Sequence, residues 1–219
     1  MVEKNRVLFA FVRLAMALTL FVGVSWPIID RVAHNVFRPT EYFSYFTILS
    51  CSLSTVVLTL GAIKLFRNEP ESVRFSTLRL IVVTSMVIVG VIYNLLLAND
   101  APDARDIGYV PPVPPNLIMH MYMPVIIFLE WLIVDSTARL KITRAFWVLV
   151  YPLIWLILTM LRGSFTDGWW PYWFLNPAEG VDVVLTWIGV IFSFFVILSI
   201  VLVVIQRLIA GNFTKKPAI

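Results

Sequence analysis

Few side chains in this sequence of 219 residues can do nucleophilic, acid–base or metal chemistry. The chain has two histidines, His34 and His120, and a single cysteine, Cys51. His120 is the candidate general base, because a neutral imidazole can take a proton from a weak nucleophile such as a hydroxyl group. The search for a site therefore begins with the hydroxyl groups that can come near His120.

A stripe of small polar residues offers such hydroxyl groups. Its members are three or four residues apart, so on a helix they share one face: Ser44, Thr47, Cys51 and Ser54, with Ser50 and Thr55 beside them. Small and hydroxyl-bearing residues also let membrane helices pack closely. On its own, the stripe indicates packing as readily as chemistry.

The elements that must position these residues are membrane-spanning helices. The chain is 60% hydrophobic and 14% charged, whereas about a quarter of the residues of a soluble domain are charged. Its apolar runs are long enough to cross a hydrocarbon core of ~30 Å. The predicted spans are Val7–Trp26, Tyr42–Phe66, Thr77–Ala98, Asn116–Asp135, Phe146–Arg162 and Val183–Arg207. We therefore expect an all-α polytopic membrane protein, a single six-helix transmembrane domain over residues 1–219.

Lysine and arginine near the span ends predict the orientation, because loops rich in them stay in the cytoplasm. The predicted outer side holds four: Arg31, Arg38, Arg105 and Arg162. The predicted cytoplasmic side holds twelve: Lys4, Arg6, Lys64, Arg67, Arg74, Arg79, Arg139, Lys141, Arg144, Arg207, Lys215 and Lys216. Both termini should be cytoplasmic. This bias accounts for the net charge of +4, so we expect contacts with membrane lipids and none with nucleic acid.

Three polar residues share one depth near the predicted outer face. Thr47, Asn94 and His120 each lie about four residues inside a different span, or ~6 Å below its outer end. A hydroxyl beside a histidine is the arrangement in which the imidazole activates a nucleophile. Matching depth alone does not establish contact, and a lone buried histidine is more often a packing residue.

Two ionisable residues lie inside spans near the predicted cytoplasmic face. Arg13 is about six residues into the first span, and Glu130 is about five residues from the end of the fourth, so their depths match. Charged groups in hydrocarbon are costly unless they are paired. We expect a structural ion pair between Arg13 and Glu130, rather than a path for protons or ions.

Other chemistries are disfavoured by composition and motif. Two histidines and one cysteine without clustered carboxylates do not supply an ordinary three-ligand zinc centre, and haem ligation by His34 and His120 is weak because His34 falls in a loop. No Gly-x-Ser-x-Gly, phosphate-binding glycine loop or His-Glu-x-x-His motif is present. We expect no cofactor and no metal.

The predicted outer loops are longer than the cytoplasmic ones. They span Pro27–Glu41, Asn99–Pro115 and Gly163–Asp182 and carry a run of prolines and a cluster of tryptophan and tyrosine. Proline runs favour ordered, extended backbone, and tryptophan and tyrosine prefer the headgroup region. These loops can form a cap over the outer end or a plain aromatic belt.

Two segments resemble the androgen-induced-protein-like membrane family and its bacterial six-helix relatives. They are Tyr42-Phe43-Ser44-Tyr45-Phe46-Thr47-Ile48-Leu49-Ser50 and Asn116 through Glu130-Trp131, with a histidine one turn before Pro124. The later elements Tyr151-Pro152, Arg162-Gly163 and Trp170-Pro171-Tyr172 are similar to the bacterial branch. The resemblance implies an intramembrane threonine hydrolase acting on fatty acid esters of hydroxy fatty acids, with Thr47 as nucleophile and His120 as base, in a bacterial plasma membrane. The chain departs from that branch at Leu49 and Cys51, where Gln and Asn are usual.

The corresponding mechanism is a Thr47–His120 dyad that cleaves a lipid ester drawn from the outer leaflet. Asn94 is the candidate donor to the developing oxyanion, with Ser44 and Ser50 as further oxyanion or substrate-binding candidates. The acid that would orient His120 stays open among Asp100, Asp103, Asp106 and Asp167. The alternative is a non-catalytic lipid-binding or transport protein that uses the same polar cluster, or a purely structural bundle.

Overall fold

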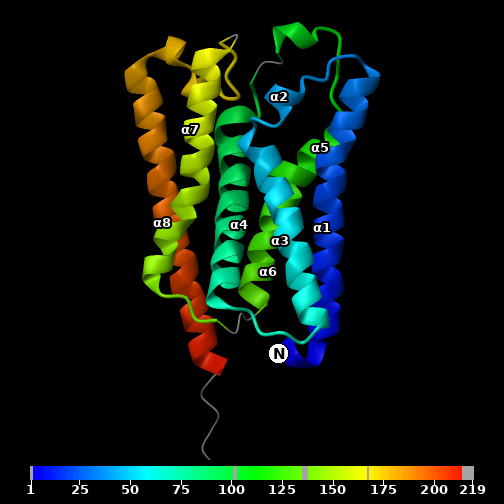
Figure 1. Cartoon of the computed structure of the whole chain (residues 1–219), viewed down its shortest axis with the longest axis vertical. Coiled ribbons are helices and arrows are strands. Elements are labelled where there is room, and N and C mark those ends of the chain that lie inside the picture. Colours follow the sequence, from blue (N-terminus) through cyan, green and yellow to red (C-terminus); the bar gives the residue numbers. More distant parts are fainter. Residues whose placement is uncertain (1, 101–102, 135–137, 167, 214–219) are drawn as a thin grey trace, which may run out of the picture.

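The computed structural model describes residues 2–100, 103–134, 138–166 and 168–213, and this part of the chain consists of helices and loops (Figure 1). Six helical stretches are long and apolar enough to cross a membrane: Asn5–Ala33, Phe46–Phe66, Val73–Leu97, Val113–Ile133, Ile142–Phe165 and Val181–Leu208. Each overlaps one predicted span, so the prediction of six apolar helices is confirmed. Asp135, Ser136, Asp167, Lys215 and Lys216 lie outside the described residues.

The secondary structure divides these stretches into shorter elements. The α-helices are α1 Val2–Ala33, α2 Pro39–Tyr42, α3 Phe46–Phe66, α4 Val73–Ile92, α5 Val113–Leu117, α6 Met123–Ile133, α7 Val150–Phe165 and α8 Val181–Phe213. Tyr93–Leu97 (η1) and Ile118–Tyr122 (η3) are π-helical. Short 3-10 helices are η2 Ala104–Asp106, η4 Ile142–Leu149, η5 Trp173–Leu175 and η6 Pro177–Glu179. A π-helical turn widens a helix and often lies at a functional site.

The first helix is longer than the sequence predicts. We expect it to end at Trp26 because a proline follows, yet α1 continues through Pro27 to Ala33. A proline inside a helix displaces the carbonyl four residues earlier, and that residue is Gly23. The missing side chain there also lets η3 approach, since a Cβ on Gly23 would lie 3.1 Å from Ile118 Cγ2.

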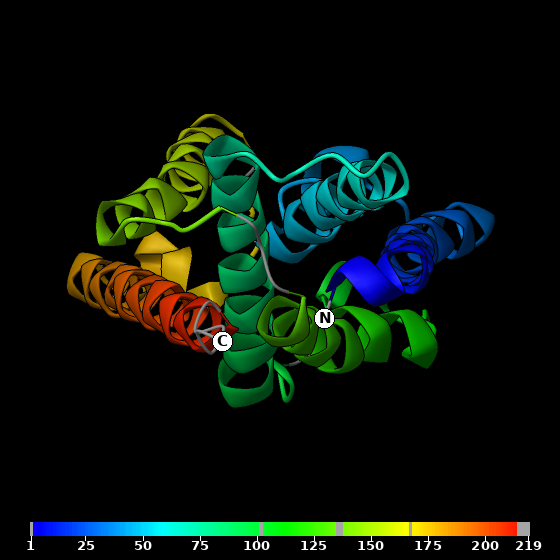
Figure 2. The same cartoon turned by 90° about the horizontal axis from the view of Figure 1, so that it is seen from below.

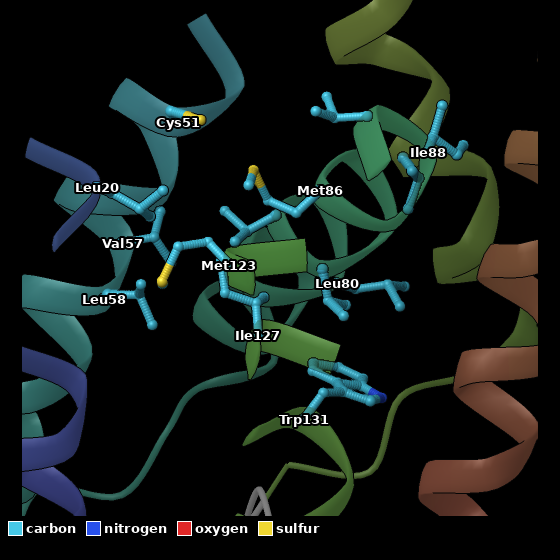
Figure 3. Close-up of a cluster of buried hydrophobic side chains, with 14 of the residues drawn as sticks. Leu20, Cys51, Val57, Leu58, Leu80, Met86, Ile88, Met123, Ile127 and Trp131 are labelled. Carbon is cyan, nitrogen blue, oxygen red and sulfur yellow. The ribbon is translucent and has the colours of Figure 1, made fainter. Parts of the chain in front are cut away.

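α4 lies at the centre of the bundle. Seen along the bundle, α1, α3, α5 and α6 lie on one side of α4, and α7 and α8 lie on the other (Figure 2). The main core is made on the first side, where side chains of α1, α3, α4 and α6 meet; Leu20, Val57, Met86 and Met123 are examples (Figure 3). α1 begins and α8 ends at the same end of the bundle (Figure 1). We call this the inner end, because the sequence predicts it to be cytoplasmic, and the opposite end the outer end.

The outer loops pack over the outer end and contain α2, η2, η5 and η6. Phe174 and Leu175 of η5 are buried, and Trp170 packs on Gly163, where an added Cβ would lie 2.3 Å from the indole ring. The described loop segments are therefore packed against the helices rather than forming only a belt of aromatic side chains. This packing encloses the cavity described next.

Candidate functional site

A cavity of about 650 Å³ lies at the outer end, between the helices and the outer loops. Thr47 of α3, Tyr93 of η1 and His120 of η3 all line it. The structure thus brings Thr47 and His120, which the sequence pairs by depth, to the walls of one space. The outer loops supply the rest of the lining, including Tyr109 and Tyr172.

His120 is held with one ring nitrogen engaged. Its Nδ1 lies 3.0 Å from the backbone oxygen of Asn116. A carbonyl oxygen only accepts, so Nδ1 carries the proton in the neutral ring, and Nε2 keeps its lone pair. The ring of Tyr93 stacks on the imidazole at 3.8 Å between centroids, and the side-chain amide of Asn116 donates to the Tyr93 hydroxyl. This arrangement leaves Nε2 as the ring nitrogen with a free lone pair.

The π-helical turn at His120 is explained by Pro124. A proline has no N–H for the carbonyl four residues earlier, and here that carbonyl belongs to His120. Asn94 donates to this oxygen at 3.2 Å and to the Gly90 oxygen at 2.8 Å. Gly90 allows the approach, because a Cβ there would lie 2.9 Å from Pro124 Cβ. Asn94 thus ties α4 to the segment that carries His120.

This contact corrects one prediction. Asn94 is not among the residues lining the cavity, and its two amide hydrogens are directed to backbone carbonyls. In this conformation it has no hydrogen left for an oxyanion, so Asn94 is a positioning residue. The depth of Asn94 within its span gave no indication that the His120 carbonyl lacks a backbone N–H donor because residue 124 is a proline.

Thr47 is the second residue of α3, at a helix N-terminus, and its side chain is buried. The hydroxyl oxygen of Tyr172, from the loop before η5, accepts the Phe46 N–H at 3.1 Å. The Thr47 side chain lies beside the same hydroxyl. Burial raises the pKa of Tyr172 above its usual value, so the hydroxyl stays protonated. An outer-loop tyrosine therefore replaces the missing side-chain cap of α3 beside the candidate nucleophile.

The two predicted serines lie away from the cavity lining. Ser44 Oγ donates to the Thr40 oxygen at 2.6 Å, a local turn contact. Ser50 Oγ shares a hydrogen bond of 3.2 Å with the Tyr151 hydroxyl and is buried. Neither serine lines the outer cavity, so neither is placed to bind substrate there.

The group that orients His120 is not one of the acidic side chains considered in the sequence analysis. Asp103 and Asp106 are bonded to arginines, Asp167 lies outside the described residues, and Asp100 lines the cavity. The nitrogen of His120 that an acid would hold is already bonded to the carbonyl of Asn116. A backbone carbonyl can fix the tautomer just as a carboxylate does. The orienting group is therefore in the chain's own backbone.

Charged residues close the outer end of the cavity. Arg105 binds both oxygens of Glu41, at 2.8 and 2.9 Å, and Asp103 at 2.6 Å. Arg38 binds Glu41 at 3.0 Å and also Asp106. These bonds join α2 to the loop around η2. The hydrogen bonds from Arg105 lower the pKa of Asp103 to about 2, so this carboxylate is ionised at neutral pH.

The inner end holds the expected pair, within a larger group. Arg13 Nε lies 2.7 Å from Glu130 Oε1. Arg79 binds Glu130 at 2.9 Å and Glu71 at 2.8 Å, and Arg13 binds Glu71 at 3.1 Å. Four buried charges thus form a closed, neutral ring joining α1, α4, α6 and the α3–α4 loop. Arg79, which the sequence analysis counts among the charges near the inner span ends, has a buried side chain within this ring.

Sequence reasoning missed four contributors to these sites. Tyr172 was placed in a loop that could form either a cap or an aromatic belt, and Tyr93 within a span, and no sequence spacing links them to Thr47 or His120. For Glu71 and Arg79 the sequence gave only a weak indication of a role at the inner end, because both lie within a few residues of a predicted span start. Among the described residues, no group of three or more histidine, cysteine and acidic side chains could hold a metal ion.

Comparison of the chain with protein-family models, with curated proteins and with solved structures finds no match. The assignment of function therefore depends on the geometry of the site and on the motifs quoted above.

Proposed function

We propose that the chain is an intramembrane threonine hydrolase that cleaves a lipid ester, of the fatty acid ester of hydroxy fatty acid type, with Thr47 as nucleophile and His120 as general base. The observation that carries the proposal is the shared cavity: Thr47 and His120 both line it, and Nδ1 of His120 is bonded to the carbonyl of Asn116. Only the Nε2 lone pair is then available for a proton.

The contact of Tyr172 supports the position of the nucleophile. Its hydroxyl oxygen accepts the Phe46 N–H at 3.1 Å, so the first turn of α3, which carries Thr47, is held against the outer loop. The reactive oxygen stands at the N-terminus of α3, where backbone N–H groups and the helix dipole favour negative charge.

The reaction has two steps. His120 Nε2 takes the proton as Thr47 Oγ bonds to the ester carbon, and the C–O bond to the alcohol breaks as that alcohol receives the proton. Water then attacks the acyl-threonine, His120 takes the proton of the water, and the acid leaves as Thr47 recovers its own proton. No cofactor is needed for this chemistry. The substrate enters from the outer leaflet of the membrane, which we take to be a bacterial plasma membrane.

The test is covalent labelling of the purified, folded protein with an ethyl fluorophosphonate, followed by mass spectrometry of the modified residue. We expect phosphonylation at Thr47 in the wild type and its loss in Thr47→Ala and His120→Ala. Ser44→Ala is the matched control, because it removes a hydroxyl that bonds only to a nearby turn, and it should label like the wild type. Folded protein that shows no labelling would favour the alternative, lipid binding or transport without turnover.

A further inference from the structure

A second, apolar cavity adjoins the site inside the helical bundle. Its volume is about 60 Å³, roughly a tenth of the outer cavity. Three helices supply most of its walls. The residues are Val89 and Ile92 of α4, Pro152 and Trp155 of α7, and Ile191 and Phe192 of α8. We call this space the apolar crevice.

The apolar crevice and the outer cavity share a boundary. Thr47, Tyr93, Leu97 and Tyr172 line both spaces. On one side of Thr47 the lining includes charged residues such as Arg38 and Asp106, and on the other side it is almost wholly aliphatic or aromatic. The candidate nucleophile therefore stands where a polar compartment meets an apolar one.

The crevice is narrow and can be reached from the side. α7 and α8 stand on the same side of α4 (Figure 2), and Trp155, Ile191 and Phe192 are only half-buried. Because these residues belong to the apolar spans, the surroundings of the opening are hydrocarbon. A space this small and apolar has room for only the first few methylene groups of an alkyl chain and excludes a polar headgroup, so the rest of such a chain would lie in the hydrocarbon beside α7 and α8.

We propose that the apolar crevice holds the part of the acyl chain next to the ester carbonyl, so that the carbonyl carbon lies at Thr47, the rest of the chain continues into the hydrocarbon beside α7 and α8, and the alcohol portion lies in the outer cavity. This inference rests on the proposed hydrolase function and adds the orientation of the substrate. The acyl-threonine intermediate keeps its chain among α4, α7 and α8, while the released alcohol leaves through the polar outer end. The preferred substrate is an ester whose acyl part is an unbranched fatty acid.

The first experiment compares two fluorophosphonates, ethyl and hexadecyl, on Ile191→Trp. The larger side chain fills the crevice, so we expect Thr47 labelling by the hexadecyl probe to fall at least tenfold and labelling by the ethyl probe to stay within twofold. Val190→Trp is the matched control, since Val190 is the preceding residue, 52% exposed and outside the crevice. Equal effects of Ile191→Trp on both probes, or none on the hexadecyl probe, would overturn the inference.

The second experiment is independent of turnover. Thr47→Ala protein is irradiated with a hexadecanoyl ester carrying a diazirine on its chain, and the crosslinked residues are mapped by mass spectrometry. Crosslinks concentrated at Ile92 and Phe192, and reduced by Ile191→Trp, support the inference even if Thr47 labels with neither probe, in which case only the hydrolase proposal fails. Crosslinks spread over exposed residues such as Leu95 and Val190 show ordinary lipid contact and overturn it.

Discussion

At the scale of single residues, each catalytic candidate has neighbours that fix its protonation or its orientation. His120 is set by the Asn116 carbonyl and the Tyr93 ring, and Thr47 by Tyr172. None of these partners is a carboxylate, although a neutral hydrogen bond is enough to select a tautomer or to orient a hydroxyl. The site can thus operate among apolar helices without a buried unpaired charge, which would be costly there.

The contribution of the Tyr172 hydroxyl can be tested by replacing the tyrosine with phenylalanine, which removes only the hydroxyl group. Tyr172→Phe should slow ethyl fluorophosphonate labelling of Thr47 roughly tenfold, since the loss of one hydrogen bond of ~1.5 kcal/mol corresponds to a factor of about ten. The ring remains and keeps its stacking on Phe174. Tyr151→Phe, which removes a hydroxyl bonded to Ser50, should label at the wild-type rate.

The pKa of Tyr172 predicts how the effect of Tyr172→Phe on the labelling rate varies with pH. Burial raises the pKa of Tyr172 above the usual tyrosine value, so its hydroxyl stays protonated. The ratio of wild-type to Tyr172→Phe labelling rates should therefore be constant from about pH 6 to about pH 10, where an ordinary tyrosine begins to ionise. A ratio that falls towards one as the pH approaches 10 would contradict a buried, protonated Tyr172.

At the scale of elements, the two π-helical turns carry His120 and the residues that hold it, Tyr93 and Asn94. Pro124 frees the His120 carbonyl, Asn94 satisfies it, and Gly90 lets α4 and α6 come close enough for that bond. A regular helix at this position would turn His120 to another direction. The widened turns are therefore part of the site and not defects in the spans.

This interpretation predicts coupling between Asn94 and Pro124. Asn94→Leu should destabilise the protein by about 1–3 kcal/mol, because the His120 carbonyl loses its donor. In a Pro124→Ala background the new N–H can bond that carbonyl, so the same change should cost less. Thermal or denaturant unfolding of the four proteins measures the coupling, and equal costs in both backgrounds would rule it out.

The ion pairs over the outer end are a second element-scale feature. The pKa of Asp103 is lowered to about 2 by hydrogen bonds from Arg105. The stability that its carboxylate gives is present above its unfolded pKa and is lost as the pH falls towards about 2. Asp103→Asn should thus make the segment 103–112 more sensitive to pepsin at pH 4, and the difference from wild type should shrink steeply as the pH falls to 2. A difference as large at pH 2 as at pH 4 would assign the effect to something other than this charge.

At the scale of the whole molecule, the buried ring of four charges holds the inner end together. Arg13→Met leaves an excess negative charge and Glu130→Gln an excess positive one, whereas the double change leaves the Arg79–Glu71 pair neutral. Each single change should cost about 3–5 kcal/mol, and the double change less than either. Unfolding measurements on the three variants check this, and additive losses would mean that the charges do not act as a group.

The sequence by itself determined the six apolar helices and the match between Arg13 and Glu130. These follow from runs of hydrophobic residues and from the high cost of charge in hydrocarbon, both of which are local properties of the chain. The matching depths of Thr47 and His120 were not confirmed, because Thr47 is the second residue of α3 whereas His120 lies seven residues after the start of its apolar stretch at Val113. The helix ends were less well predicted, because Pro27 is tolerated where Gly23 makes room.

Only the tertiary structure decided which polar groups meet. Tyr172 is 125 residues from Thr47 in the sequence, and its contact with the N-terminus of α3 depends on how the outer loop packs. The sequence suggested Asn94 as an oxyanion donor, but in the structure it donates to the His120 carbonyl, which has no backbone donor at Pro124. The sequence spacing also gave no indication that Glu71 and Arg79 form ion pairs with Arg13 and Glu130. Hydrogen bonds between distant segments depend on packing, and a pattern read along one helix carries no information about the helix beside it.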